Sequence, residues 1–150
     1  MINNCSSCQK HRATNIKEPM LSHQIPDLSY NKLGLDICEY AKKTYLVVSD
    51  YYSRYLDIIA LKTKTASKCI ANLKVCFSNH GIPLEIVADN MPFNSLQFRN
   101  FCKSVDIKLT TTSPRYAQCN GFAEKSVGIA KSLIKKSSEN EQELWLALLD

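Results

Sequence analysis

The sequence predicts an α/β domain in which a five-stranded mixed sheet is flanked by helices. Strand-like apolar segments come first, helical segments then alternate with further strands, and the links between the first three strands are short. Short links favour an antiparallel meander, whereas strands joined through helices favour parallel neighbours. The 150 residues suit one folded domain.

Each element has a local signal. Apolar runs rich in β-branched residues between turn residues indicate strands, and apolar residues at three- and four-residue spacing indicate helices. One such helical stripe consists of Ala66, Ile70, Leu73 and Phe77, and Gly81 follows it and ends the helix. The predicted strands are residues 33–38, 44–49, 55–61, 84–88 and 107–111. The predicted helices are residues 65–80, 95–105 and 121–136, with a last one beginning near residue 141.

Two of these helices have a predicted buried face. The helix at 95–105 offers Leu96, Phe98 and Phe101 for burial. The helix at 121–136 has one apolar face, formed by Ala123, Val127, Ala130 and Ile134.

Composition narrows the class of protein. The apolar fraction of 45% and the charged fraction of 22% exclude a collagen-like, coiled-coil or wholly disordered chain. A net charge of +5 permits an anionic partner without requiring one. No apolar run is long enough to cross a bilayer, and the first residues do not read as a signal peptide, so we expect no membrane partner and no secretion. We therefore expect the seven cysteines to be thiols in a reducing compartment, mostly as small core residues such as Cys38, Cys69, Cys76 and Cys102.

Three acidic residues stand where apolar or neutral residues are more usual. Asp36 lies in the middle of an apolar strand, Asp89 ends the fourth strand, and Glu124 lies in the first turn of the long helix. An unpaired carboxylate inside a covered sheet is costly, and the carboxyl ends of parallel strands are where open α/β sheets bind ligands. Other roles stay open for each residue: Asp36 as a paired buried charge, Asp89 as a turn residue, and Glu124 as an acid that complements the helix dipole.

Three converging carboxylates would repel one another unless cations lay between them. Mg²⁺ and Mn²⁺ suit carboxylate and water ligands. Enzymes that catalyse in-line phosphoryl transfer often use two such ions. The residues therefore predict a two-metal phosphoryl-transfer site.

The same residues carry a resemblance to a known family. Asp36 in LGLDI, Asp89 in VADNMPFNS and Glu124 in SPRYAQCNGFAEKSVGIAK resemble the Asp-Asp-Glu signature of retroviral-type integrase catalytic cores, and most closely those of gypsy-type LTR retrotransposons. The segment VVSDYYSRYLDIIAL adds to this resemblance, which covers residues 33–150. The 34 residues between Asp89 and Glu124 are one short of the family pattern, because the loop after Asp89 lacks one residue.

The resemblance implies a ribonuclease H-like fold and an enzyme, a metal-dependent polynucleotidyl transferase. Such an enzyme trims the 3′ ends of retroelement DNA and joins them to target DNA. Asp36, Asp89 and Glu124 would be the catalytic residues and the ligands of two Mg²⁺ or Mn²⁺ ions. Two alternatives remain: a host-adopted or decayed integrase domain that binds nucleic acid or protein without catalysis, and a nuclease that cuts RNA–DNA hybrids.

The loop before Glu124 supplies further candidates for contacting DNA. Asn120 stands where family members place a polar amide near the DNA end. Arg115 and Tyr116 are candidates for contacting a phosphate or stacking on a base. A plain loop that hinges at Gly121 is the alternative.

Two lysines share the helical face of Glu124. Lys131 and Lys135 follow it by seven and eleven residues, so all three project in nearly the same direction. They are candidates for neutralising DNA phosphates, with an ordinary solvated face as the alternative. Family members often have a basic residue where this chain has Gly128.

Residues 1–30 are interpreted as an N-terminal arm and residues 31–150 as the integrase core, truncated at its C-terminal helices. Cys5 and Cys8 have zinc-ligand spacing, and the resemblance makes them the second half of a His-His-Cys-Cys module. Zn²⁺ is expected only if two histidines lie upstream; a substitute site using His11 or His23 is the alternative. The expected partners are element and target DNA and further copies of the chain, as a homodimer or higher oligomer, in the nucleus or a cytoplasmic particle.

Overall fold

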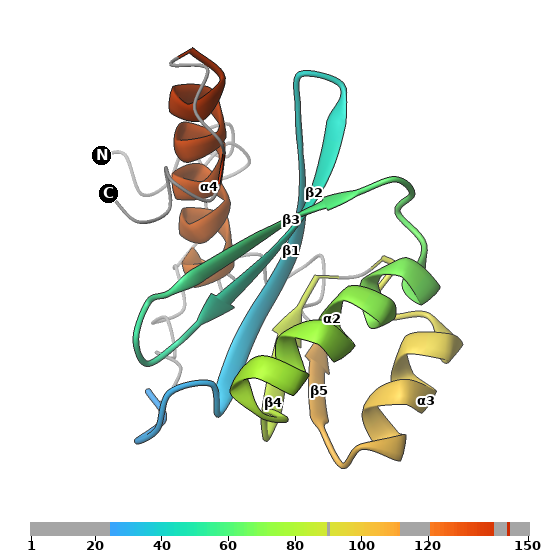
Figure 1. Ribbon diagram of the computed structural model, residues 1–150. Helices are drawn as coiled ribbons and strands as arrows, with labels where there is room; N and C mark the ends of the chain where they lie inside the picture. Colours follow the sequence, from blue (N-terminus) through green and yellow to red (C-terminus); the bar gives the residue numbers. More distant parts are fainter. Residues whose placement is uncertain (1–24, 90, 112–120, 140–143, 145–150) are drawn as a thin grey trace, which may run out of the picture.

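The computed structural model describes residues 25–89, 91–111, 121–139 and 144, without the side chains of residues 121, 123 and 124. Five strands form one sheet in the order β3-β2-β1-β4-β5, flanked by helices on both faces (Figure 1). The strands are β1 (Lys32–Tyr40), β2 (Lys43–Asp50), β3 (Leu56–Leu61), β4 (Glu85–Ala88) and β5 (Lys108–Thr111). The helices are α2 (Ala66–His80), α3 (Leu96–Ser104) and α4 (Gly121–Glu139). None of these helices is long and apolar enough to span a membrane.

The strand directions confirm the predicted mixed sheet. β1, β2 and β3 pair antiparallel in a meander. β4 returns through α2 to pair parallel with β1, and β5 returns through α3 to pair parallel with β4. A parallel neighbour cannot be reached through a tight turn, so each of these two strands is preceded by a helical crossover. The first and fourth strands are therefore neighbours at the centre of the sheet.

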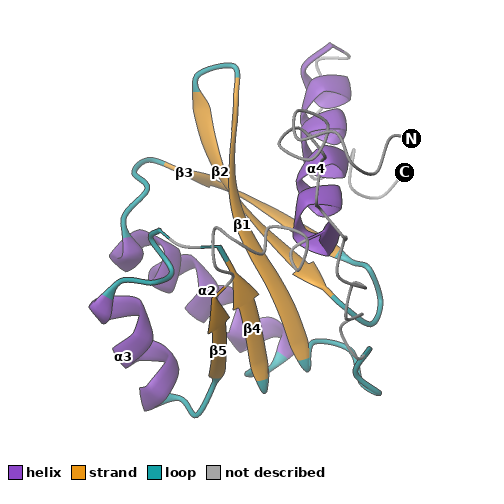
Figure 2. Cartoon of the chain, turned by 180° about the vertical axis from the view of Figure 1, so that it is seen from behind, coloured by secondary structure: helices purple, strands orange, loops and turns teal. Residues whose placement is uncertain are grey.

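The helices form two unequal layers. α2 and α3 cover one face of the sheet, and α4 crosses the other face over the meander (Figure 2). Beneath α2 and α3 lies the larger core, which includes Leu33, Leu35, Ile86 and Ala88. Beneath α4 lies a smaller core, which includes Cys38 and Val47 from the sheet and the α4 residues Ala130 and Ile134. Alternate residues of β1 thus face different layers, as the period of a strand requires.

Most of the predicted helix faces are confirmed. Ala66, Ile70, Leu73 and Phe77 are all buried, and so are Ala130 and Ile134, with Val127 partly buried against them. The four cysteines predicted to fill the core are buried free thiols. Ala123 and the helix predicted from residue 141 lie outside the described side chains and residues, except for Leu144, which packs against the smaller core.

The prediction that Leu96 is buried is wrong, since 75% of its surface is exposed. α3 begins at Leu96 after its N-cap Ser95, whose side chain accepts a hydrogen bond from the backbone N–H of Phe98. Phe98 is fully buried, and Leu96, two residues earlier on the helix, lies on the opposite side. The N-cap therefore sets which apolar side chain of this first turn enters the core.

The β1–β2 hairpin gives a stability prediction. Its two loop residues, Ala41 and Lys42, have φ values of 47° and 63°, the left-handed conformation of a type I′ turn. Neither residue type favours this conformation, so replacing the pair with Asn-Gly is expected to raise the free energy of unfolding by about 1 kcal/mol. Urea denaturation measures the gain. Lys62→Gly, outside the turn, is the control and is expected to give no gain; an equally stable Asn-Gly variant would contradict the prediction.

Candidate active site

The register of the two central strands brings two of the predicted acids together. The parallel β1–β4 ladder ends with Leu35 beside Ala88, and the next residues along the two strands are Asp36 and Asp89. Leu35 and Ala88 both point into the core beneath α2 and α3. Because side chains alternate along a strand, Asp36 and Asp89 are directed to the other face, where α4 lies. We refer to them as the carboxylate pair.

The two members of the carboxylate pair differ in exposure. Asp36 is half-buried within β1, and one carboxylate oxygen, Oδ1, accepts a hydrogen bond of 2.7 Å from the backbone N–H of Ile37. Its antiparallel partner is Val47, which is fully buried beneath α4. Asp89 is exposed and follows β4 directly. One carboxylate is thus anchored in the sheet, and the other lies at the open carboxyl end of a strand.

The start of α4 is held against the sheet by Phe122. Its ring lies 4.3 Å from the ring of Tyr51, and the Arg54 guanidinium lies 4.7 Å from its centre. Gly34 lies underneath, where an added Cβ would come within 3.6 Å of the Phe122 ring and 2.7 Å of the Ser49 hydroxyl. We refer to Gly34, Tyr51 and Arg54 as the Phe122 socket.

Glu124 lies two residues after Phe122 in the first turns of α4, so the socket fixes the part of the helix that carries it. Its side chain is outside the described set. Gly34 and Asp36 are two positions apart on β1 and therefore share the face that α4 crosses. The backbone of Glu124 thus lies on the same face of the sheet as the carboxylate pair.

Further along α4, Lys131 lies beside β1. Burial raises the pKa of the Cys38 thiol, the positive charge of Lys131 opposes this rise, and the negative charge of Asp36 adds to it. Cys38 therefore lies within electrostatic reach of both charges. Lys135 is exposed, and its Nζ lies 3.7 Å from Glu139 Oε1 in an exposed ion pair. Of the two predicted DNA-binding lysines, Lys131 is thus the one whose charge reaches Cys38, two residues after Asp36 on β1.

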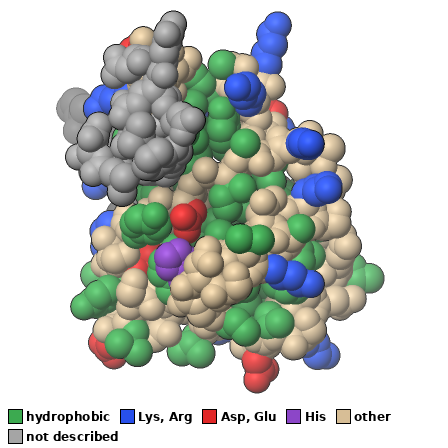
Figure 3. All heavy atoms as spheres, in the orientation of Figure 1, with side chains coloured by type: hydrophobic (Ala, Val, Ile, Leu, Met, Phe, Trp, Pro, Cys, Tyr) green, Lys and Arg blue, Asp and Glu red, His purple; other side chains and the backbone are tan. Residues whose placement is uncertain are grey.

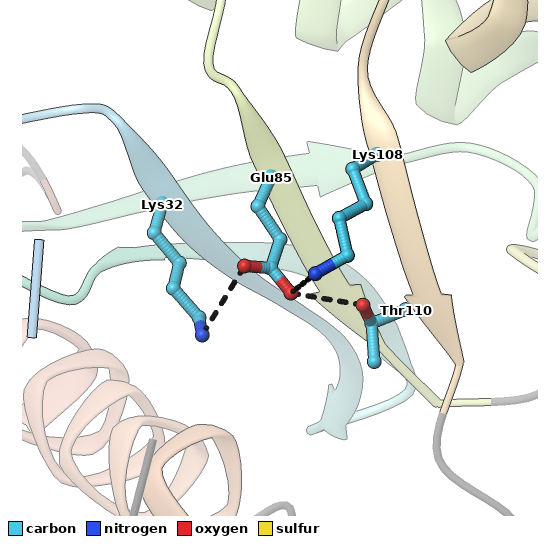
Figure 4. Close-up of polar contacts among 4 residues, drawn as sticks. All are labelled: Lys32, Glu85, Lys108 and Thr110. Atoms are coloured by element: carbon cyan, nitrogen blue, oxygen red, sulfur yellow. Dashed lines mark hydrogen bonds and ion pairs between the residues drawn. The ribbon is translucent and has the colours of Figure 1, made fainter. Parts of the chain in front are cut away.

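A further acid on this face, Glu85, has a different role. It is the first residue of β4 and lies between Lys32 of β1 and Lys108 of β5, with Nζ–Oε distances of 3.4 and 3.5 Å (Figure 4). The Thr110 hydroxyl also donates to it at 2.9 Å. Burial alone would raise the pKa of Glu85, but the Thr110 hydrogen bond and the two lysines outweigh this and lower it. Its charge is compensated within the sheet, so we assign it a structural role.

Five further predicted site residues lie outside the part of the chain that the structure describes. They are Asn120, Arg115, Tyr116, Cys5 and Cys8. Among the side chains that the structure describes, no group of three His, Cys, Asp or Glu residues is positioned to hold a metal ion. The described part of the site is therefore the carboxylate pair with the start of α4 above it.

The Phe122 socket was not predicted from the sequence. The signals were present: an aromatic residue two positions before Glu124, and an aromatic and basic turn, Tyr51–Tyr55, after the second strand. What links them is the crossing of α4 over the meander, which no local pattern specifies.

The sheet order, the crossovers and the carboxylates at the centre of the sheet define the class of the fold, which is ribonuclease H-like. The model of the integrase core domain family matches residues 29–117. The chain belongs to this family.

Relatives and solved structures agree with that assignment. The chain is 29% identical over 138 residues to an uncharacterized Caenorhabditis elegans protein, covering 91% of this chain and 11% of that protein. It is 36% identical over 96 residues to the Gag-Pro-Pol polyprotein of human T-cell leukemia virus 3, covering 63% of this chain and 7% of the polyprotein. The chain thus spans only about a tenth or less of the length of these relatives.

Three solved structures are similar over most of the chain. The simian T-cell lymphotropic virus intasome, solved in complex with the PP2A regulatory subunit B56 gamma, has a TM-score of 0.72 and 28% identity, covering 96% of this chain and 55% of that one. The HTLV-2 integrase catalytic core in complex with magnesium, in a trimeric form, has a TM-score of 0.62 and 28% identity, covering 81% of each chain. The bovine immunodeficiency virus integrase core, at 20% identity and a TM-score of 0.66, shares the fold.

Proposed function

We propose that this chain is the catalytic core of a DNA integrase, which trims the 3′ ends of retroelement DNA and joins them to target DNA. The observation that carries the proposal is the β1–β4 register, because it brings Asp36 and Asp89 together on the face that α4 crosses with Glu124. Membership of the integrase core domain family supports the same reaction class.

In this proposal the protein supplies positioning and charge. Asp36 on an inner strand, Asp89 at the end of its neighbour and Glu124 on α4 hold the metal ions from three separate elements. Lys131 and Lys135 contact phosphates of the DNA along α4, and Asn120, Arg115 and Tyr116 contact the DNA end. A reaction at a phosphodiester requires charge compensation more than a protein nucleophile, which agrees with a site made of acids and lysines.

The carboxylate pair fits a hard divalent cation. Two carboxylates directed to one face at a strand end supply the oxygen ligands that Mg²⁺ and Mn²⁺ prefer. When bound, two such ions would activate a water or a DNA 3′ hydroxyl and stabilise charge on the phosphate. The related HTLV-2 core was solved in complex with magnesium, which supports Mg²⁺ here. Zn²⁺ is proposed only for the arm of residues 1–30, and only with upstream histidines.

Metal removal tests the proposal. With duplex oligonucleotides copied from the ends of the encoding element, we expect joining to a plasmid in Mg²⁺ or Mn²⁺ and none in excess EDTA. Without the metal ions the negative acids repel the phosphate, and no cation stabilises the charge of the reacting group. Joining is measured by gel electrophoresis, and Mg²⁺ uptake in the presence of the oligonucleotide by calorimetry. DNA binding without Mg²⁺ uptake or joining would contradict it and favour a binding-only domain.

The Phe122 socket gives a second prediction. Phe122→Ala removes the ring that fixes the start of α4, so we expect the joining rate to fall about tenfold to a hundredfold and the Mg²⁺ requirement to rise. Phe122→Tyr keeps the ring and is expected to leave the joining rate and the Mg²⁺ requirement close to those of the wild type. Joining rates over a Mg²⁺ titration measure the effect. If the joining rate of Phe122→Ala fell only in proportion to the fraction of unfolded protein, and its Mg²⁺ requirement were unchanged, Phe122 would contribute to stability alone.

We propose that the chain acts on element and target DNA as a homodimer or larger oligomer, in the nucleus or a cytoplasmic particle. The HTLV-2 core has been solved in dimeric and trimeric forms, which supports self-association. The buried free thiols agree with a reducing compartment.

A further inference from the structure

β5 forms one edge of the sheet, next to α3 (Figure 2). The Lys108 backbone N–H donates to the carbonyl of Leu84 at 2.9 Å, so the main chain of Lys108 bonds toward β4. Because main-chain groups alternate in direction along a strand, the N–H and C=O of Leu109 and Thr111 are directed away from the sheet. No described strand pairs with this outer edge, which is therefore able to accept one more strand.

A groove of about 560 Å³ runs along the same edge between β5 and α3. Cys102 and Ile107, both nearly fully buried, and the partly buried Leu109 give it an apolar side. Side chains of an added strand would alternate, with every second one entering this groove. The edge and the groove together thus provide both parts of a strand-addition site: main-chain hydrogen bonds and a surface for alternate side chains.

The charge along the groove identifies the partner. Arg99 and Lys103 are exposed and lie four residues apart on α3, so they share one face of the helix. Arg99 is oriented by Asn94, whose side-chain oxygen accepts from Nε at 2.9 Å and also from Nη2. Lys108 also lines the groove, although its Nζ contacts Glu85 on the other face of the sheet. Asp106 is the acid of the lining, at the turn that ends the groove.

Basic side chains are also frequent on one side of the molecule. In Figure 3, Lys and Arg side chains are distributed down the side of the molecule that carries the hairpin tip, α2 and α3. The spacing also fits, because alternate side chains of a strand are about 7 Å apart and residues four apart on a helix have Cβ atoms about 6 Å apart. Acidic side chains at alternate positions of an added strand would therefore meet Arg99 and Lys103 in turn.

We propose that the edge of β5 and the groove beside α3 bind an extended acidic peptide segment of a partner protein, which adds a parallel or antiparallel strand to the sheet. Leu109 and Thr111 supply the main-chain hydrogen bonds, Arg99 and Lys103 bind alternate acidic side chains, and the apolar side of the groove contacts the stems of those side chains. This surface is separate from the carboxylate pair, so the proposal does not depend on catalysis.

The test uses a fluorescein-labelled peptide of alternating valine and glutamate, with binding followed by fluorescence anisotropy on the full chain. We expect saturable binding that Lys103→Glu weakens about fivefold to tenfold, because an attraction is replaced by a repulsion. Lys68→Glu, an equal charge change on the exposed face of α2, is the matched control and is expected to leave the affinity unchanged. Methylating alternate amide nitrogens of the peptide is expected to abolish binding, since a methylated amide cannot pair with the edge.

Several results would overturn the proposal. Absence of saturable binding at millimolar peptide would do so, and equal binding of the N-methylated peptide would show that charge alone is responsible. Equal weakening by Lys68→Glu would place the peptide elsewhere. Stronger Lys103-dependent binding of a random duplex oligonucleotide would assign the groove to nucleic acid, and a Lys103-dependent dimer in sedimentation would assign it to a second copy.

Discussion

Replacing Asp89 with Asn is expected to lower the rate of Mg²⁺-dependent DNA joining by about a thousandfold or more. The change keeps the shape of the side chain but removes one negative charge and one strong ligand oxygen at the open end of β4. Asp89 is exposed, so no packed contact of the core is lost and the fold should be retained. The measurement is the single-turnover joining rate, with circular dichroism and urea denaturation reporting the fold.

The matched control is Asp106→Asn. Asp106 is also an exposed acid, in the turn before β5, and its φ of 60° is a conformation that Asn tolerates well. It lies away from the carboxylate pair and is expected to leave joining unchanged. Full activity of the Asp89→Asn variant would end the assignment of this acid, and an equal loss in both variants would show that the effect is one of general charge.

The largest expected effect on stability comes from Asp50, at the end of β2. Its side chain is buried, and its carboxylate accepts five hydrogen bonds: from the Ser29 hydroxyl, from the backbone N–H of Tyr30 and Tyr52, and from both the N–H and the hydroxyl of Ser53. These bonds tie residues 29–30 to the turn that presents Tyr51 and Arg54 to Phe122.

Asp50→Ala is therefore expected to lower the free energy of unfolding by about 3 kcal/mol or more, because several donors lose a charged acceptor together. Urea denaturation measures the loss. Asp27→Ala, at an exposed acid two residues before Ser29, is the control and is expected to change stability by less than about 0.5 kcal/mol. Equal losses in the two variants would contradict the role of the hydrogen bonds.

The same residue predicts a pH dependence. Burial alone would raise the pKa of Asp50, but the hydrogen bonds from Ser53, Ser29 and Tyr52 outweigh it and lower the pKa. A lowered pKa in the folded state means that the stabilisation is complete above the ordinary value of about 3.9 and is lost as the pH falls through the folded value. The stability difference between wild type and Asp50→Ala should thus shrink in acid; a difference that stays constant down to pH 2 would contradict it.

The fold was largely predictable because its signals are local. Ala66, Ile70, Leu73 and Phe77 repeat with the period of a helix, and the predicted boundaries of the five strands lie within about two residues of the observed ones. Leu96 was predicted to be buried because apolarity alone does not say which side of a first turn faces the core; Ser95 decides that through its N-cap.

The candidate site, too, was predictable in part from the sequence. A charged residue inside an apolar strand is unusual enough to mark Asp36 by itself, and the order of Asp36, Asp89 and Glu124 carries the family resemblance. Asp36 and Asp89 come together because of a strand register that pairs Leu35 with Ala88, 53 positions later in the chain (88 − 35). Packing of the whole sheet sets this register.

The sequence by itself thus determined the element types, the thiol core and the family of this protein, since periodicity, polarity and motif order are properties of neighbours along the chain. Only the tertiary structure decided that α4 crosses the meander with Phe122 against Tyr51 and Arg54. It also decided that Lys32 and Lys108 compensate the charge of Glu85, and that β5 is an edge beside a basic groove. These features join residues from different elements, and their energies depend on distances that exist only after the sheet and its two helical layers have packed.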